Sequence, residues 1–96
     1  MVKEKAMKIV HKADNQRFET TINGHTAFLS YEKVNENTLN YNHTIVPYAL
    51  GGRGVGKALA KFALDYACDH NFKIIPSCSF VKYFLTKNPE YADLVV

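Results

Sequence analysis

Four glycines in a short loop are the residues of this sequence best placed for chemistry. Three of them lie between Val46, which ends an apolar strand pattern, and Val55, which begins an amphipathic helical pattern, and the fourth, Gly56, follows Val55. Backbone N–H groups at a helix start carry partial positive charge and bind anions, and glycine lets a ligand approach the backbone closely. The sequence therefore predicts a phosphate or pyrophosphate site formed by Gly51, Gly52, Arg53, Gly54, Val55, Gly56 and Lys57.

A structural interpretation of this loop stays open beside the phosphate hypothesis. Glycines also serve tight strand-to-helix turns, although alternate glycines at positions 52, 54 and 56 exceed what a turn requires. The side chains of Arg53 and Lys57 either meet phosphate charge or remain solvated cations, because a backbone nest binds anions without a side-chain charge.

Two common nucleotide-binding motifs do not fit the loop. The dinucleotide fingerprint G-x-G-x-x-G fails because the glycines at 52, 54 and 56 alternate. The Walker pattern G-x-x-x-x-G-K-[ST] matches from Gly51 to Lys57, but Ala58 supplies no hydroxyl for Mg²⁺. A nucleoside triphosphatase also requires a larger parallel sheet than this chain can form.

Cys78 and His43 are the candidate catalytic residues. Cys78 follows a predicted strand and begins a predicted helix, and a helix N-terminus lowers the pKa of a thiol and favours the thiolate. The alternative for Cys78 is packing as a small apolar side chain, the role that we expect for Cys68. His43 lies on a predicted strand, where it acts as a general base or makes structural hydrogen bonds. The histidines and cysteines lack metal-ligand spacing, so we expect no metal.

Five strands and two helices are predicted from the hydrophobic patterns. The strands cover residues 6–12, 17–22, 26–31, 39–46 and 72–75, and the helices cover residues 55–70 and 79–87. Asn23-Gly24 indicates a two-residue hairpin between the second and third strands. The order predicts an α+β fold: a mostly antiparallel sheet of about five strands, one right-handed β-α-β crossover joining the parallel strands 39–46 and 72–75, and a C-terminal helix.

The same patterns predict which side chains share a face. On the strand 39–46, one face carries Leu39, Tyr41, His43 and Ile45. On the long helix, the apolar stripe consists of Val55, Ala58, Leu59, Phe62, Ala63, Tyr66 and Ala67. On the second helix, the side chains expected to point inward are Phe80, Tyr83 and Phe84.

Composition predicts one small cytoplasmic domain. The 96 residues, 47% of them apolar, suffice for a single core over residues 1–96. Two cysteines make no disulfide framework, and no apolar run approaches a signal or membrane-spanning helix, so we expect a reducing compartment and no membrane partner. The net charge of +3 is mild, and the lysine-rich start is expected to be solvated rather than to bind nucleic acid.

Five short segments carry a resemblance to a known family. They are Arg17-Phe18-Glu19, His43-Thr44-x-Val46-Pro47, the loop at 52–56, the run at 76–81, and Asn88-Pro89-Glu90-Tyr91. Together they are similar to the small GCN5-related N-acetyltransferase-like (GNAT) domains. Gly54-Val55-Gly56 matches the second half of that family's acyl-CoA loop, [Q/R]-x-x-G-x-[G/A], whereas Gly51 stands where the family has Gln or Arg.

The resemblance implies acetyl-CoA as cofactor and an amine, on a small molecule or a peptide, as acceptor. It implies that the glycine loop holds the pyrophosphate, that the backbone of Val46 meets the pantetheine arm, and that the two parallel strands splay apart to admit it. It places Cys78 beside the thioester, as acyl acceptor or polar neighbour. It also offers Tyr83 as an acid for the leaving thiolate, or else as a core residue.

Two classes of function follow as expectations. The first is an acetyl-CoA-dependent N-acetyltransferase, which the position of Cys78 favours. The second is a non-catalytic CoA-binding or protein-interaction module, which is favoured by Gly51 and by the lack of a pattern for the N-terminal helices that shape the acceptor site in larger relatives. A weaker third possibility is a nucleic-acid accessory protein that uses the basic N-terminus.

Overall fold

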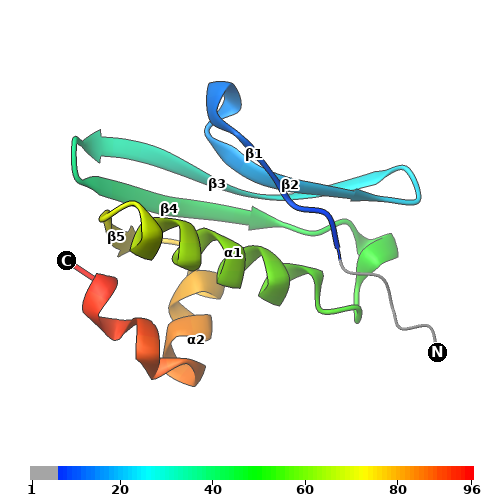
Figure 1. Cartoon of the computed structure of the whole chain (residues 1–96). Helices are drawn as coiled ribbons and strands as arrows, with labels where there is room; N and C mark the ends of the chain where they lie inside the picture. Colours follow the sequence, from blue (N-terminus) through cyan, green and yellow to red (C-terminus); the bar gives the residue numbers. More distant parts are fainter. Residues whose placement is uncertain (1–6) are drawn as a thin grey trace.

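The computed structural model describes residues 7–96 as a five-stranded sheet with both α-helices on one side of it (Figure 1). The strands follow one another across the sheet in the order β1-β2-β3-β4-β5. They are β1 (Val10–Lys12), β2 (Arg17–Ile22), β3 (His25–Asn35), β4 (Thr38–Ile45) and β5 (Lys73–Pro76). The helices are α1 (Val55–Asp69) and α2 (Ser79–Lys87), and short 3-10 turns are η1 (Ala13–Asn15), η2 (Tyr48–Leu50) and η3 (Pro89–Leu94).

The predicted α+β architecture is confirmed. Strands β1 to β4 pair antiparallel, and α1 crosses over to β5, which runs parallel to β4. β3 is longer than predicted at both ends, and β1 begins at Val10 rather than Ala6, which lies outside the described residues. The hairpin between β2 and β3 turns on Asn23 and Gly24, whose φ angles of 51° and 80° are those of a left-handed two-residue turn.

Helix α1 packs on two sides rather than one. Its buried residues are Val55, Leu59, Ala60, Ala63, Leu64 and Ala67. Ala60 and Leu64 fall outside the predicted stripe but are buried, and α2 and η3 also pack against α1. Phe62, predicted inside the stripe, is 36% exposed. The hydroxyl of Tyr41 in β4 donates a hydrogen bond of 2.5 Å to the Ala63 carbonyl, which ties the sheet to the middle of α1.

β4 contains a β-bulge at Asn42, and beyond this bulge the predicted assignment of side chains to the two faces of the strand is wrong. Tyr31 pairs with Tyr41 but Ser30 pairs with His43, so β4 carries one extra residue there. Past the bulge the alternation is inverted: Thr44, not His43, lies on the helix side, and His43 is on the opposite, exposed face.

Ile45 changes face for the same reason and is 49% exposed. The Ser30 hydroxyl donates a hydrogen bond of 2.8 Å to Asn42 Oδ1, which fixes the side chain of the extra residue. Alternate side chains of β4 lie on the same face only as long as its register with β3 is unbroken. Nothing in the apolar pattern marks the bulge.

The C-terminal segment covers the free edge of β5. Val95 forms a parallel bridge with Ile74, and the Val96 N–H donates to the Ile74 carbonyl at 3.0 Å. The Tyr91 hydroxyl donates to Asp65 Oδ1 at 2.6 Å, joining η3 to α1. Among the helices of residues 7–96, none is long and apolar enough to cross a membrane.

Candidate functional site

The pairing between the two parallel strands, β4 and β5, ends before β4 does. Their register runs from Thr38 opposite Lys73 to Tyr41 opposite Pro76, and the last link is a 3.0 Å hydrogen bond from the Cys78 N–H to the Tyr41 carbonyl. β4 then continues through residues 42–45 paired to β3 alone, within the part of the chain that the structure describes. The bulge at Asn42 lies where this pairing ends, and β5 itself ends at Pro76, so the splay implied by the resemblance stays a prediction.

The glycine loop connects this end of β4 to α1. Gly52 and Gly54 have φ angles of 79° and 75°, a left-handed conformation that other residues rarely adopt. Gly54 is the N-cap of α1, and the first helical hydrogen bond runs from the Ala58 N–H to the Gly54 carbonyl at 3.0 Å. The N–H groups of Val55, Gly56 and Lys57 therefore precede the helical ladder and are directed out of the helix start.

The remaining loop residues differ in what they can offer to an anion. The Gly51 N–H already donates to the Tyr48 carbonyl at 3.0 Å, so it is used within η2. Gly56 lies close to α2, since a Cβ there would lie 3.0 Å from Cζ of Phe80. The side chains of Arg53 and Lys57 are exposed and free to meet charge in solvent. Val46 follows the last paired residue of β4 and packs partly against the core.

Cys78 lies at the junction of these elements. It is the N-cap residue of α2, partly buried against the core, and its Sγ is 3.4 Å from the Thr44 hydroxyl. Burial by itself raises the pKa of the thiol, but the Thr44 hydroxyl and the backbone N–H groups of Phe80 and Val81 outweigh it and lower the pKa below the ordinary value. The Cys78 side chain makes no capping hydrogen bond at the start of α2. The lowered pKa favours the thiolate, which is the nucleophilic form.

The structure does not bring His43 to Cys78. Thr44, the next residue along β4, contacts Sγ on the helix side, whereas His43 is exposed on the other face opposite Ser30. His43 as general base stays a prediction, and it requires an acceptor amine that approaches from the open face of the sheet.

Three further side chains lie differently from what the sequence predicts. Thr44 was missed, because its contact with Cys78 depends on the bulge. Cys68 is exposed on α1 rather than packed as expected. Tyr83 is 57% exposed rather than inward. Residues 7–96 contain no group of three or more His, Cys, Asp or Glu side chains placed to hold a metal ion.

The profile of the GCN5-related N-acetyl-transferase family matches residues 17–94 of the chain. The chain belongs to this family. The match includes the sheet from β2 onward, the glycine loop, Cys78 and both helices, so the GNAT resemblance seen in the sequence is confirmed.

Individual proteins are similar to this chain over most of its length. Protein NATD1 of Xenopus tropicalis is 33% identical over 86 residues, which cover 88% of this chain and 79% of that protein. Protein NATD1 of Mus musculus is 33% identical over 85 residues, which cover 86% and 77%. The NMR solution structure of a GCN5-like protein from Staphylococcus aureus is similar with a TM-score of 0.73 at 36% identity, over 94% of this chain and 88% of that one.

Proposed function

We propose that this protein binds acetyl-CoA through the start of α1 and the gap beside β4, and passes the acetyl group to an amine on a small molecule or a peptide. One observation carries the proposal: residues 42–45, which have no partner on the β5 side among residues 7–96, run from the point where Cys78 bonds to Tyr41 toward the loop that leads into the start of α1. Phosphate oxygens fit the N–H groups at the start of α1, and an amide-rich arm fits an unpaired strand edge.

The chain's own groups have distinct parts in this proposal. The N–H groups of Val55, Gly56 and Lys57 hold the pyrophosphate, and the backbone from His43 to Val46 receives the pantetheine amides. Acetyl-CoA supplies the activated acetyl thioester. Cys78 lies where the pairing of β4 with β5 ends and is the candidate nucleophile, with the Thr44 hydroxyl as donor to its thiolate.

Transfer through Cys78 proceeds in two steps. Sγ forms a bond to the acetyl carbon while the bond from that carbon to the CoA sulfur breaks, leaving acetyl-Cys78 and a CoA thiolate. The amine then bonds to the same carbon, the bond to Sγ breaks, and the amine proton passes to the Cys78 thiolate or to solvent. In the alternative, direct route, the amine attacks the bound thioester and Cys78 is a polar neighbour.

A matched pair of variants tests the binding site. Asp and Asn both tolerate the left-handed conformation of Gly54 and have nearly the same shape, so they differ mainly in charge at the helix start. By calorimetry, the wild type should bind acetyl-CoA with a dissociation constant in the micromolar range, roughly −8 kcal/mol. Gly54→Asp should bind at least about tenfold more weakly than Gly54→Asn. Equal affinities would place the phosphates elsewhere.

The chemistry is tested by incubation with acetyl-CoA in the absence of amine. Thioester exchange between two thiols is nearly thermoneutral, so a hydroxylamine-sensitive acetyl group should accumulate on Cys78. Cys78→Ala should still bind acetyl-CoA, because the contacts that hold it are backbone groups, but should lose transfer to amines. Wild-type transfer by Cys78→Ala would establish the direct route.

The second candidate function is a non-catalytic CoA-binding module. It is favoured by Gly51, which lacks the side chain that the family places at this position, and by the separation of His43 from Cys78. Binding of CoA without transfer to any amine, in both the wild type and Cys78→Ala, would establish this function instead.

A further inference from the structure

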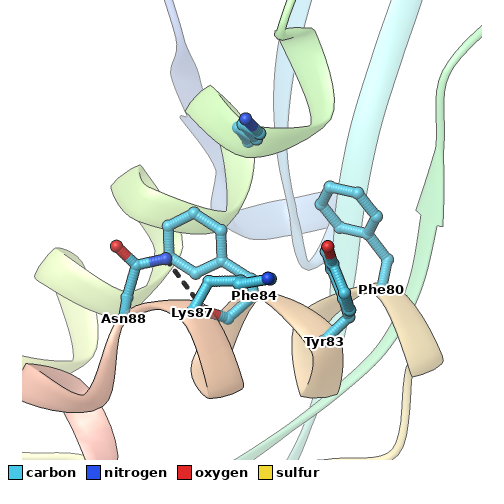
Figure 2. A pocket seen from close by; sticks show the side chains of 6 residues that line it. Phe80, Tyr83, Phe84, Lys87 and Asn88 are labelled. Carbon is cyan, nitrogen blue, oxygen red and sulfur yellow. Dashed lines mark hydrogen bonds between the residues drawn. The ribbon is translucent and has the colours of Figure 1, made fainter.

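The two faces of the sheet differ in what covers them. Both α-helices lie on one face (Figure 1), and the cavity on that side, of about 480 Å³, is lined by Lys57, Phe80, Tyr83, Phe84, Lys87 and Asn88. Figure 2 shows the labelled side chains standing along one side of α2. Lys57 is part of the start of α1, so this cavity belongs to the site already described. Within residues 7–96, no α-helix covers the opposite face of the sheet, which is called the open face below.

The open face carries two residues of the motif Arg17-Phe18-Glu19, which the proposed function does not use. Phe18 is fully buried and packs against Tyr66 of α1, so its two neighbours in β2 lie on the open face. Arg17 Nε donates to Glu19 Oε2 at 2.6 Å, and the guanidinium carbon lies 4.2 Å from the centre of the Phe28 ring. An ion pair and an aromatic ring therefore hold this cation in one place.

The guanidinium of Arg17 still has donors to offer. Glu19 occupies Nε, whereas the two Nη groups have no hydrogen-bond partner within residues 7–96. The side chain is 32% exposed, so a ligand can reach it. Lys12 is paired with Arg17 across β1 and β2 and adds positive charge beside it. Arginine binds carboxylates and phosphates through paired N–H donors, so an anionic group fits this position.

A row of side chains connects Arg17 to the candidate nucleophile. Arg17 is paired with Ser30 of β3, and Ser30 is paired with His43 of β4, so the three lie in one row across the open face. Neighbouring strands are about 4.8 Å apart, so the row spans about 10 Å. His43 directly precedes Thr44, whose hydroxyl contacts Cys78 Sγ on the other face. The row therefore begins at a cation and ends one residue from the contact with Cys78.

We propose that the acceptor is an amine that also carries a carboxylate or a phosphate, and that Arg17 binds this anionic group while the amine lies beside His43. The guanidinium lies over Phe28, which is one strand from β4, so the amine and the anionic group should be roughly 5–10 Å apart, one to two strand spacings. This inference rests on the proposed function, which places the thioester beside Cys78. It adds a class of acceptor and makes Arg17 a residue that determines specificity.

The test measures the binding of amines to the protein saturated with CoA, which has no acetyl group to transfer. The probes are 6-aminohexanoate, 5-aminopentyl phosphate and hexylamine, and hexylamine alone lacks an anionic group. Titrations of ¹⁵N-labelled wild type should give a dissociation constant at least about tenfold lower for one or both anionic amines than for hexylamine, with shifts at Ser30 and His43. The tighter of the two anionic probes identifies the group. With acetyl-CoA in place of CoA, the same preference should appear in kcat/KM for acetyl transfer.

Substitutions of Arg17 separate recognition of the anion from a structural role. Arg17→Gln should abolish the preference and leave the affinity for hexylamine nearly unchanged. Arg17→Lys should retain part of the preference, because the charge remains and the paired donors are lost. The matched control is Lys82→Gln, an exposed change on α2, which should retain the full preference. Urea denaturation of each variant verifies that it is folded, and the comparison of the three amines in the wild type stands without any variant.

Three results would overturn the inference and leave the proposed function standing. They are equal wild-type affinities for the three amines, a preference that persists in Arg17→Gln, and a loss of affinity by the same factor for all three amines in Arg17→Gln, which would make Arg17 a structural residue. Failure of the wild type to bind CoA would overturn the proposed function and this inference with it.

Discussion

At the scale of single residues, the contact between Thr44 and Cys78 determines what the thiol can do. The Thr44 hydroxyl and the N–H groups of Phe80 and Val81 lower the pKa of Cys78 despite the opposing effect of burial. A lowered pKa means that the thiolate persists to lower pH than in an ordinary cysteine. The reactivity of Cys78 at a given pH should therefore exceed that of a cysteine with an ordinary pKa and should depend on Thr44.

Alkylation by iodoacetamide tests this dependence. In the wild type, the rate at Cys78 should rise with pH to a midpoint below the 9.0 of an ordinary thiol. Thr44→Val removes the hydroxyl with little change of shape, so it should move the midpoint upward and slow the reaction near neutral pH. The exposed Cys68 in the same molecules is the control and should react alike in both proteins. An unchanged Cys78 midpoint in Thr44→Val would contradict this account of the site.

Saturating CoA should slow alkylation of Cys78 and leave that of Cys68 unchanged. The expected protection follows from the position of Cys78 where the pairing of β4 with β5 ends, because an arm bound there covers Sγ. The same reaction with and without CoA, followed by mass spectrometry of the two cysteine peptides, measures it. A Cys78 rate that is the same with CoA bound would make Cys78 a packing residue.

At the scale of elements, the start of α1 and the start of α2 approach each other at Gly56 and Phe80. Alanine stabilises a helix interior by up to about 1 kcal/mol relative to glycine. Here that gain is opposed, because a Cβ at position 56 would lie 3.0 Å from the Phe80 ring. We expect Gly56→Ala to be neutral or destabilising in the wild type, but stabilising in the background of Phe80→Leu, whose smaller side chain makes room.

Urea denaturation of the four proteins in this double-mutant cycle measures the coupling. A clearly non-additive free energy of unfolding would show that the two helix starts pack as one unit. Additive effects would mean that Gly56 is present for its approach to a ligand and not for its contact with Phe80.

The sequence predicts these elements better than it predicts their faces. Strand and helix positions follow from apolar periodicity, and the glycine loop and Cys78 follow from composition at a helix start. The bulge at Asn42 has no signal in the apolar pattern, so His43 and Ile45 were placed on the wrong face and Thr44 was missed. The exposure of Tyr83 was also hidden, because an aromatic residue at helical spacing looks the same whether it lines a core or a cavity.

At the scale of the whole molecule, an aromatic cluster fastens the first strand to the fold. His11 in β1 stacks on Phe18 with ring centres 4.6 Å apart, and its Nε2 is 2.7 Å from the Tyr31 hydroxyl. Tyr66 of α1 lies between His11 and His70, with centre distances of 4.6 and 4.1 Å. Burial, and secondly the charge of His70, lower the pKa of His11 below 6.5.

This shift makes the stability of the fold depend on pH. A lowered histidine pKa means that the unfolded chain takes up the proton first, so the stabilisation is complete above pH 6.5 and is lost as the pH falls through the folded-state pKa. Urea denaturation at pH 7.5 and pH 5.5 should show a smaller loss of stability on acidification in His11→Gln than in the wild type. Equal losses in the two proteins would remove His11 from the explanation.

At the scale of the whole molecule, bound acetyl-CoA should contact the start of α1, the unpaired end of β4 and Cys78 together. Titration of ¹⁵N-labelled protein with acetyl-CoA, followed through the backbone amide resonances, tests this most directly. We predict saturable shifts of Gly54, Val55, Gly56 and Lys57, of residues 43–46 and of Cys78, all with one dissociation constant. Shifts confined to other parts of the molecule, or no shifts at millimolar acetyl-CoA, would contradict it.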